Sequence, residues 1–135
     1  MFGIGKATAW KHYNLFCNLV HTHLAPICIK WPSSNEQWDA VKNGFSKKKA
    51  NFKNCVGAID GCHIPIHGVS DDRLNTYINR KGWASINILA ICDSNKMFMY
   101  VNVRWPGSVS DKRILSTSNL GIVVAFDYLI ESQQV

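Results

Sequence analysis

CVGAIDGCHIPI, residues 55–66, combines a strand-like apolar run with a single acidic side chain, Asp60. Apolar residues on both sides of Gly61 indicate a buried strand that the glycine interrupts, and Pro65, which cannot donate a ladder hydrogen bond, indicates a sheet edge or a bulge. Burying an isolated carboxylate is costly unless a cation or hydrogen-bond donors meet it. Asp60 is therefore either a metal ligand or a turn residue that is capped locally.

The sequence downstream predicts two more strands joined in a hairpin, followed by a helix. Residues 84–92 form an apolar run, residues 93–96 (Asp-Ser-Asn-Lys) suit a hairpin loop, and residues 97–105 alternate as a return strand. A proline and a glycine then end the third strand. Residues 108–118 begin with a serine cap and carry Asp111 in the first turn, which favours a helix.

Two polar stretches are expected to connect the first strand to the second. Asp71-Asp72 indicates a loop, and Asn79-Arg80-Lys81-Gly82 indicates a turn. Arg80 and Lys81 could bind phosphate there, although exposed turn charge is the more common explanation.

The N-terminal part of the chain is expected to begin with a helix. Apolar residues recur at helical spacing over residues 6–24, with Thr8 available as the cap and Pro26 as the stop. Its first turns carry lysine, histidine and asparagine after a Phe-Gly-Ile-Gly stretch, much as in the second helix of a helix-turn-helix. Two interpretations stay open, a helix that docks on DNA and a core helix with a solvated polar face.

A second helix is predicted over residues 36–45, with Ser33 or Ser34 as its cap. The positive run Lys47–Lys49 follows it and either contacts phosphate or is simply solvated. We place a boundary after this basic linker, so that residues 1–53 form a helical N-terminal segment, partly helix-turn-helix-like.

Composition narrows the class of protein. With 135 residues and 47% apolar content the chain suits one domain with a packed core. A net charge of +6 and a pI near 9.2 favour polyanionic partners such as nucleic acid. No run is long enough to span a membrane, and the N-terminus lacks the features of a signal peptide.

The cysteines indicate a reducing, intracellular compartment. Their number is odd, they lack framework spacing, and each lies in an apolar neighbourhood, so we expect reduced core residues. They are Cys17, Cys28, Cys55, Cys62 and Cys92. Cys55, Cys62, His63 and His67 also raise the question of zinc, but strand alternation would direct Cys62 and His63 to opposite faces, so we do not expect that site.

Three motifs occur in order along the chain. They are GAIDGCHI (57–64), NRKG (79–82) with SIN (85–87), and WPGS (105–108) with SDKR (110–113). As a set they resemble the PIF/Harbinger transposases and the harbinger transposase-derived nuclease. IKWP at 29–32 and the helix after it resemble the family's lead-in, so the resemblance spans roughly residues 3 to 120.

The resemblance implies a ribonuclease H-like α/β fold, a mixed sheet that opens with three antiparallel strands followed by a helix. Residues 54–135 would then form a partial nuclease domain of the DDE type. The family is expected to cleave DNA phosphodiesters with Mg²⁺ or Mn²⁺ held by clustered carboxylates. Asp60 and Asp111 match two acidic positions and are the expected catalytic metal ligands, although Asp111 also suits a helix first turn.

Other candidate residues match the family's pattern less directly. His63, which is usually a satisfied strand histidine, could orient substrate or water beside Asp60, and Arg113 could bind phosphate. Further acidic residues of the family follow a later strand and helix, and neither motif is visible here. Residues 121–128 suit a fourth strand, yet Asp127 and Glu131 cannot be assigned as ligands.

Because motifs are missing at both ends, we expect a fragment or altered gene product of a longer protein. The resemblance implies DNA as partner, a separate Myb-like DNA-binding protein as a second partner, and the nucleus as location, with the cytoplasm as a further one. A catalytically inactive DNA-binding or partner-binding fragment is the alternative function, and a chain without function is the third.

Overall fold

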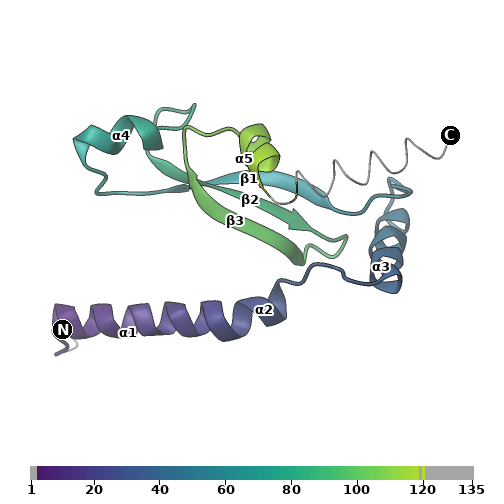
Figure 1. The fold of residues 1–135 in the computed structure, drawn as a ribbon, viewed down its shortest axis with the longest axis horizontal. Helices are drawn as coiled ribbons and strands as arrows, with labels where there is room; N and C mark the ends of the chain where they lie inside the picture. The colour runs from purple at the N-terminus through teal and green to yellow at the C-terminus, as the bar shows by residue number, and fades with distance from the viewer. Residues whose placement is uncertain (1–2, 119, 121–135) are drawn as a thin grey trace.

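A computed structural model describes residues 3–118 and 120, and its centre is a three-stranded antiparallel sheet (Figure 1). The strands are β1 (Ala58–Pro65), β2 (Ser85–Cys92) and β3 (Phe98–Pro106), in the order β1-β2-β3. Helix α5 (Asp111–Thr117) follows β3 and packs against β2. The predicted order of three antiparallel strands and a helix is confirmed.

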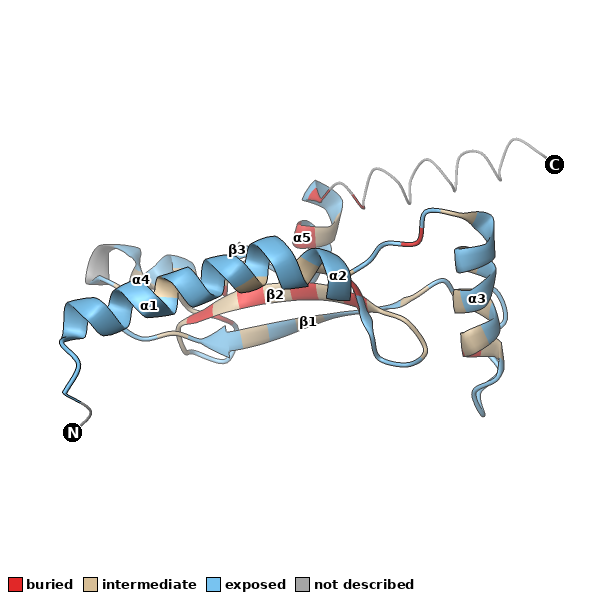
Figure 2. Ribbon diagram, turned by 90° about the horizontal axis from the view of Figure 1, so that it is seen from below, coloured by how far each residue is buried: buried red, intermediate tan, exposed pale blue. Residues whose placement is uncertain are grey.

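One face of β2 provides most of the burial in the sheet (Figure 2). Buried and half-buried residues alternate along the whole strand because successive side chains point to opposite faces. Leu89 is buried on this face, and Ile114 of α5 is fully buried. Ile91 packs with Met99 and Leu120 in a small apolar core. The side chains under α5 are therefore the most fixed in the described structure.

Strand β1 runs through Gly61 without the expected interruption, and the prediction of a buried strand is wrong, because most residues of β1 are exposed. Its pairing with β2 runs without a register shift, from Ala58 opposite Cys92 to Pro65 opposite Ser85. Glycine is tolerated because the neighbouring residues keep the ladder. Pro65 is the last residue of a strand at the sheet edge, which agrees with the edge interpretation rather than the bulge.

The β2–β3 hairpin has the predicted loop. The Asp93 carboxylate accepts hydrogen bonds from the backbone N–H groups of Asn95 and Met97, and Lys96 adopts a left-handed φ of 65°. Aspartate stabilises such turns by this local bonding. The pairing of β2 with β3 contains register irregularities, so the simple alternation expected for residues 97–105 does not hold throughout.

The N-terminal helix is longer than predicted and changes type. It comprises α1 (Lys6–Leu19), a π-helical turn η1 (Val20–Leu24) and α2 (Ala25–Cys28). Pro26 does not stop the helix, because it occupies the first turn of α2, where its missing N–H costs little. The predicted cap at Thr8 is wrong as well, since Gly5 precedes the helix without a side-chain capping bond.

Helix α3 (Asn35–Ser46) agrees with the second predicted helix. Ser34 is its cap, with the side-chain oxygen accepting from the Gln37 N–H at 3.4 Å. Phe45 is buried near its end. Gly44 lies against Ser94 so closely that a Cβ would collide with the serine side chain. This contact fixes α3 beside the β2–β3 hairpin.

Two further predictions are wrong, one about the segment between β1 and β2 and one about the burial of the cysteines. Asp71-Asp72 begins a helix, α4 (Asp71–Tyr77), where we expected a loop; Ser70 precedes it in extended conformation. The five cysteines are free, but Cys17, Cys28 and Cys62 are exposed rather than in the core. Cys17 and Cys28 lie on α1 and α2, which have no buried residue, and Cys62 lies on the edge strand β1.

The fourth strand predicted over residues 121–128 lies outside the described residues, as do Asp127 and Glu131. Among the helices that the structure does describe, none has the length and apolar character needed to cross a membrane.

Candidate functional site

The start of α5 lies directly over β1 at Gly61. A Cβ placed on this glycine would collide with all three atoms of the Asp111 carboxylate group. Glycine is therefore required for the Asp111 carboxylate to occupy this position against the strand. The loop before the helix is equally tight, because a Cβ on Gly107 would meet Ser85 and the backbone oxygen of Tyr77.

Asn87 of β2 holds the Asp111 carboxylate from below. Its side-chain amide donates to Asp111 Oδ1 at 2.8 Å and to the backbone oxygen of Val109 at 2.9 Å. Asn87 is 1% exposed, so the position of the donor is fixed by packing. Asp111 also fulfils its predicted place in the first turn of a helix, which Ser110 caps by accepting from the Arg113 N–H.

Asp60 approaches the same glycine from another side. Asp60 Oδ1 accepts a hydrogen bond from the Gly61 N–H at 2.8 Å. Ile66 donates to Ala84, and alternate residues of an antiparallel edge strand point their N–H groups outward, so the Gly61 N–H points away from β2. The Asp60 carboxylate thus lies at the outer edge of β1 and is exposed.

Both predicted ligands therefore contact Gly61, Asp60 from β1 and Asp111 from α5, but they approach it from different sides. A Cβ at position 61 would face α5, so the Cβ of the preceding Asp60 points to the opposite face of the sheet. In each carboxylate Oδ1 accepts a hydrogen bond, whereas Oδ2 accepts none from the described residues. Within residues 3–118 and 120, no group of three histidine, cysteine or acidic side chains could hold a metal ion.

His63 belongs to a buried polar network rather than to Asp60. Its Nδ1 hydrogen-bonds with Ser85 Oγ at 3.0 Å, and the same oxygen accepts from the Asn79 side-chain amide at 3.0 Å. Its ring packs edge-on against Trp83. These contacts agree with the interpretation of His63 as a satisfied strand histidine.

Sequence reasoning missed the role of Asn87. It lies opposite His63 in β1 and Trp105 in β3, in a row across the sheet. Its Oδ1 and the Trp105 Nε1 are buried without hydrogen-bond partners among the described residues. A polar residue at a buried position of an otherwise apolar strand was the available signal, since buried polar groups need a structural or functional reason.

The remaining basic candidates are exposed and are not bonded to the two carboxylates. Arg80 and Lys81 lie in the turn before β2, where Asn79 Oδ1 accepts from the Lys81 N–H. Arg113 is exposed on α5, two residues after Asp111. No described acidic side chain forms an ion pair with any of the three.

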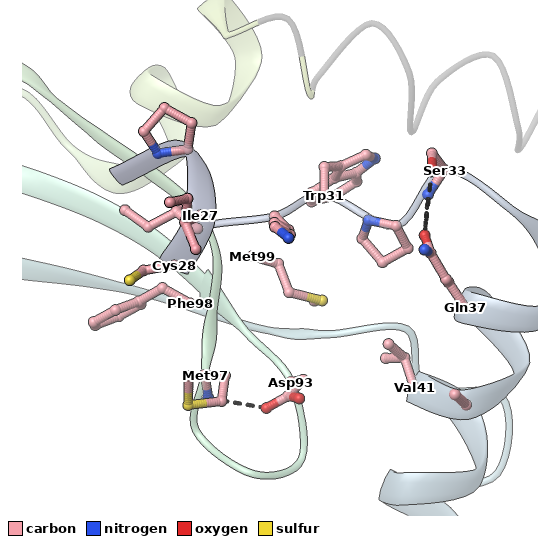
Figure 3. A pocket seen from close by; sticks show the side chains of 15 residues that line it. Ile27, Cys28, Trp31, Ser33, Gln37, Val41, Asp93, Met97, Phe98 and Met99 are labelled. Atoms are coloured by element: carbon pink, nitrogen blue, oxygen red, sulfur yellow. Dashed lines mark hydrogen bonds between the residues drawn. The ribbon is translucent and has the colours of Figure 1, made fainter. Parts of the chain in front are cut away.

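A groove of about 710 Å³ lies elsewhere, between the α2–α3 linker and the β2–β3 hairpin (Figure 3). Its lining is mainly apolar, with Trp31 packed edge-on against Trp38 and Tyr100. Its one acidic side chain, Asp93, is already bonded to the hairpin backbone. The groove therefore has a single carboxylate among its lining residues, whereas two carboxylates contact Gly61.

The family described as DDE superfamily endonuclease matches residues 59–128, a span that contains both carboxylates of the site. The chain belongs to the DDE superfamily endonucleases. This match confirms the family resemblance that the three motifs predicted. Within the DDE superfamily, the chain is a harbinger transposase-derived endonuclease domain.

Named relatives of this DDE endonuclease domain come from animals and plants. "Putative nuclease HARBI1" of Homo sapiens is 34% identical over 92 residues, covering 68% of this chain and 26% of its own length. The Mus musculus protein of that name is 37% identical over the same length. "Protein ALP1-like" of Arabidopsis thaliana is 31% identical over 91 residues, covering 67% of this chain and 21% of its own.

The chain spans about a quarter of the length of the curated relatives it matches. No solved structure matches it.

Proposed function

We propose that this chain contributes the first part of a ribonuclease H-like nuclease domain that cleaves DNA phosphodiesters with a divalent metal ion. The observation that carries the proposal is that two carboxylates contact Gly61, that of Asp60 from β1 and that of Asp111 from α5. Three antiparallel strands followed by a helix support the ribonuclease H-like assignment, as does membership of the DDE endonucleases.

The donor atoms suit Mg²⁺ or Mn²⁺. Mg²⁺ in phosphoryl-transfer sites takes one or two carboxylates and completes its shell with water and substrate phosphate. Asp60 and Asp111 would hold it, and the Oδ2 atom of each accepts no hydrogen bond from the described residues. When bound, the ion supplies Lewis-acid stabilisation of the phosphate and lowers the pKa of water.

The described residues position the acids. The amide of Asn87 and the absence of a side chain at Gly61 hold the Asp111 carboxylate over the strand. The Gly61 N–H holds the Asp60 carboxylate at the outer edge of β1. A substrate phosphate would approach at that edge, where Asp60 is exposed and no described strand pairs with the outer side of β1.

DNA binding without cleavage is the alternative function, and the distribution of charge favours it. Residues 1–59 carry eight lysines and two acidic residues, whereas residues 60–135 are balanced between the two signs. A cationic region separate from the carboxylates can bind a polyanion whether or not the acids are active. Nuclear location and a Myb-like DNA-binding partner stay proposals that follow from the family.

Plasmid nicking by the purified chain in Mg²⁺ or Mn²⁺ tests the proposal. Asp60→Asn and Asp111→Asn should each reduce the nicking rate about 100-fold or more, because each removes a charged ligand worth several kcal/mol of transition-state stabilisation. Asp39→Asn is the control, since this exposed acid of α3 only pairs with Lys42. Nicking that survives in both site variants contradicts the metal site, and binding without nicking supports the alternative.

A further inference from the structure

Positive charge is concentrated in one short part of the chain. Residues 40–59 contain five lysines and no acidic residue, and the other residues together carry ten Lys and Arg against nine Asp and Glu. Nearly all of the net charge of +6 therefore comes from this segment. Four of its lysines follow α3; we call Lys47, Lys48, Lys49 and Lys53 the basic loop.

The backbone of the basic loop is held in place. The N–H groups of Lys47 and Lys48 donate to the last carbonyls of α3, and the Asn51 N–H donates to the Lys48 oxygen at 2.8 Å. Asn51 takes a left-handed φ of 45°, a conformation that asparagine tolerates in tight turns. The buried Phe45 anchors the helix just before the loop.

The cations of the basic loop face solvent without a compensating charge. All four lysines are exposed. The ion pair that the described residues form joins Lys42 to Asp39, upstream of the loop. A lysine at a helix C-terminus also interacts favourably with the helix dipole, but that effect is confined to the last turn and leaves Lys49 and Lys53 without such a role.

The basic loop is close in sequence to the strand that carries Asp60. It precedes β1, and Lys53 is seven residues before Asp60, so their Cα atoms are at most about 25 Å apart. Duplex DNA of about seven base pairs spans that distance, at 3.4 Å per step of each strand. One bound duplex can therefore reach both the loop and the edge of β1.

We propose that the basic loop binds the phosphate backbone of DNA and positions it for the carboxylates at Gly61. The proposal deepens the proposed function and rests on it for the choice of DNA as the polyanion. The loop contacts phosphates without reading base sequence, since lysine acts there as a point charge. Figure 1 shows α3, which leads into the loop, at the opposite end of the molecule from the N-terminus.

Fluorescence anisotropy with a labelled 20-base-pair duplex in EDTA tests binding apart from cleavage. The triple variant Lys47→Ala, Lys48→Ala, Lys49→Ala should bind about tenfold or more weakly at 50 mM salt, and the slope of log affinity against log salt should fall by about three. The control is Lys6→Ala, Lys11→Ala, Lys30→Ala, which removes the same charge from exposed positions elsewhere. The control should change the slope by less than about one.

Equal losses in the two triple variants would overturn the proposal, because net charge rather than the loop would then govern binding. Wild-type chain that fails to bind the duplex, or that binds phosphatidylserine vesicles in preference to it, would overturn it too. Loop-dependent binding by a chain that never nicks DNA would contradict the nuclease function and leave the loop proposal standing.

Discussion

The N-terminal helices and the sheet use apolar residues in opposite ways. Helix α1 has no buried residue, and its large apolar side chains, such as Trp10 and Phe16, are mostly exposed. In the sheet, β2 buries even its polar residues Ser85 and Asn87. Packing therefore fixes the Asn87 side chain that holds the Asp111 carboxylate, whereas the described side-chain contacts of α1, such as the stacked rings of Trp10 and Tyr13, lie within that helix. Asp60 and Asp111 are themselves exposed, but the Asn87 amide that holds Asp111 is buried.

Leucine-to-alanine substitutions in the two regions should give the largest difference in stability. Leu89→Ala should lower the free energy of unfolding by about 3 kcal/mol, because Leu89 is 1% exposed and the change leaves a cavity under α5. Leu15→Ala should change it by less than about 0.5 kcal/mol, because Leu15 is 54% exposed. Urea unfolding followed by circular dichroism measures both values.

A cost for Leu15→Ala close to that for Leu89→Ala would show that α1 is packed in solution. The contrast between the two regions would then be wrong for the protein at the concentration measured. Sedimentation of both variants beside wild type separates self-association from folding.

A glycine pair sharpens the comparison at the site itself. Gly61→Ala should cost about 2 kcal/mol, because its Cβ displaces the Asp111 carboxylate from the Asn87 amide. Gly5→Ala, at the start of α1, meets nothing within 4 Å and should cost less than about 1 kcal/mol. Unfolding in urea again gives both numbers. A neutral Gly61→Ala would mean that the Asp111 carboxylate does not lie against Gly61.

The smallest expected effect tests the region between the two, at the start of α3. Ser34→Ala should cost about 1 kcal/mol, since it removes the oxygen that accepts from the Gln37 N–H. The Ser34 hydrogen bond, followed by the backbone N–H of Glu36, also lowers the pKa of the Glu36 carboxyl. Ionised Glu36 therefore contributes stability above its ordinary pKa of 4.5, and this is lost as pH falls through the lowered value.

The difference in stability between wild type and Ser34→Ala should accordingly narrow below that range, without closing, because the Gln37 N–H bond to Ser34 does not depend on the charge of Glu36. Thermal unfolding at a series of pH values measures the difference. A gap between the two proteins that stays constant from neutral to acid pH would contradict the contribution of Glu36.

The sequence predicted the sheet because its signals are local. Alternation in residues 84–92, the Asp93 loop and the Ser110 cap each depend on neighbours within a few positions. Local signals failed where the same residues suit both a break and the first turn of a helix. Pro26 did not stop the helix, and Asp71-Asp72 began one.

The sequence named candidate residues for the site but not their arrangement in space. The motifs singled out Asp60 and Asp111, and the structure brings both to Gly61. Asp60 and Asp111 approach Gly61 from different sides because of the register of β1, which depends on pairing with a distant strand. The support from Asn87 likewise depends on a contact across 24 positions of the chain.

The close approach at Gly61 also provides a criterion for sorting related gene copies. Transposon-derived genes accumulate substitutions, and a copy can retain both aspartates while losing the space that one of them needs. Any side chain at position 61 collides with the Asp111 carboxylate, so a copy with an altered residue there cannot keep the acid in this place. The glycine and the two aspartates should therefore be scored together as one unit when intact copies are separated from decayed ones.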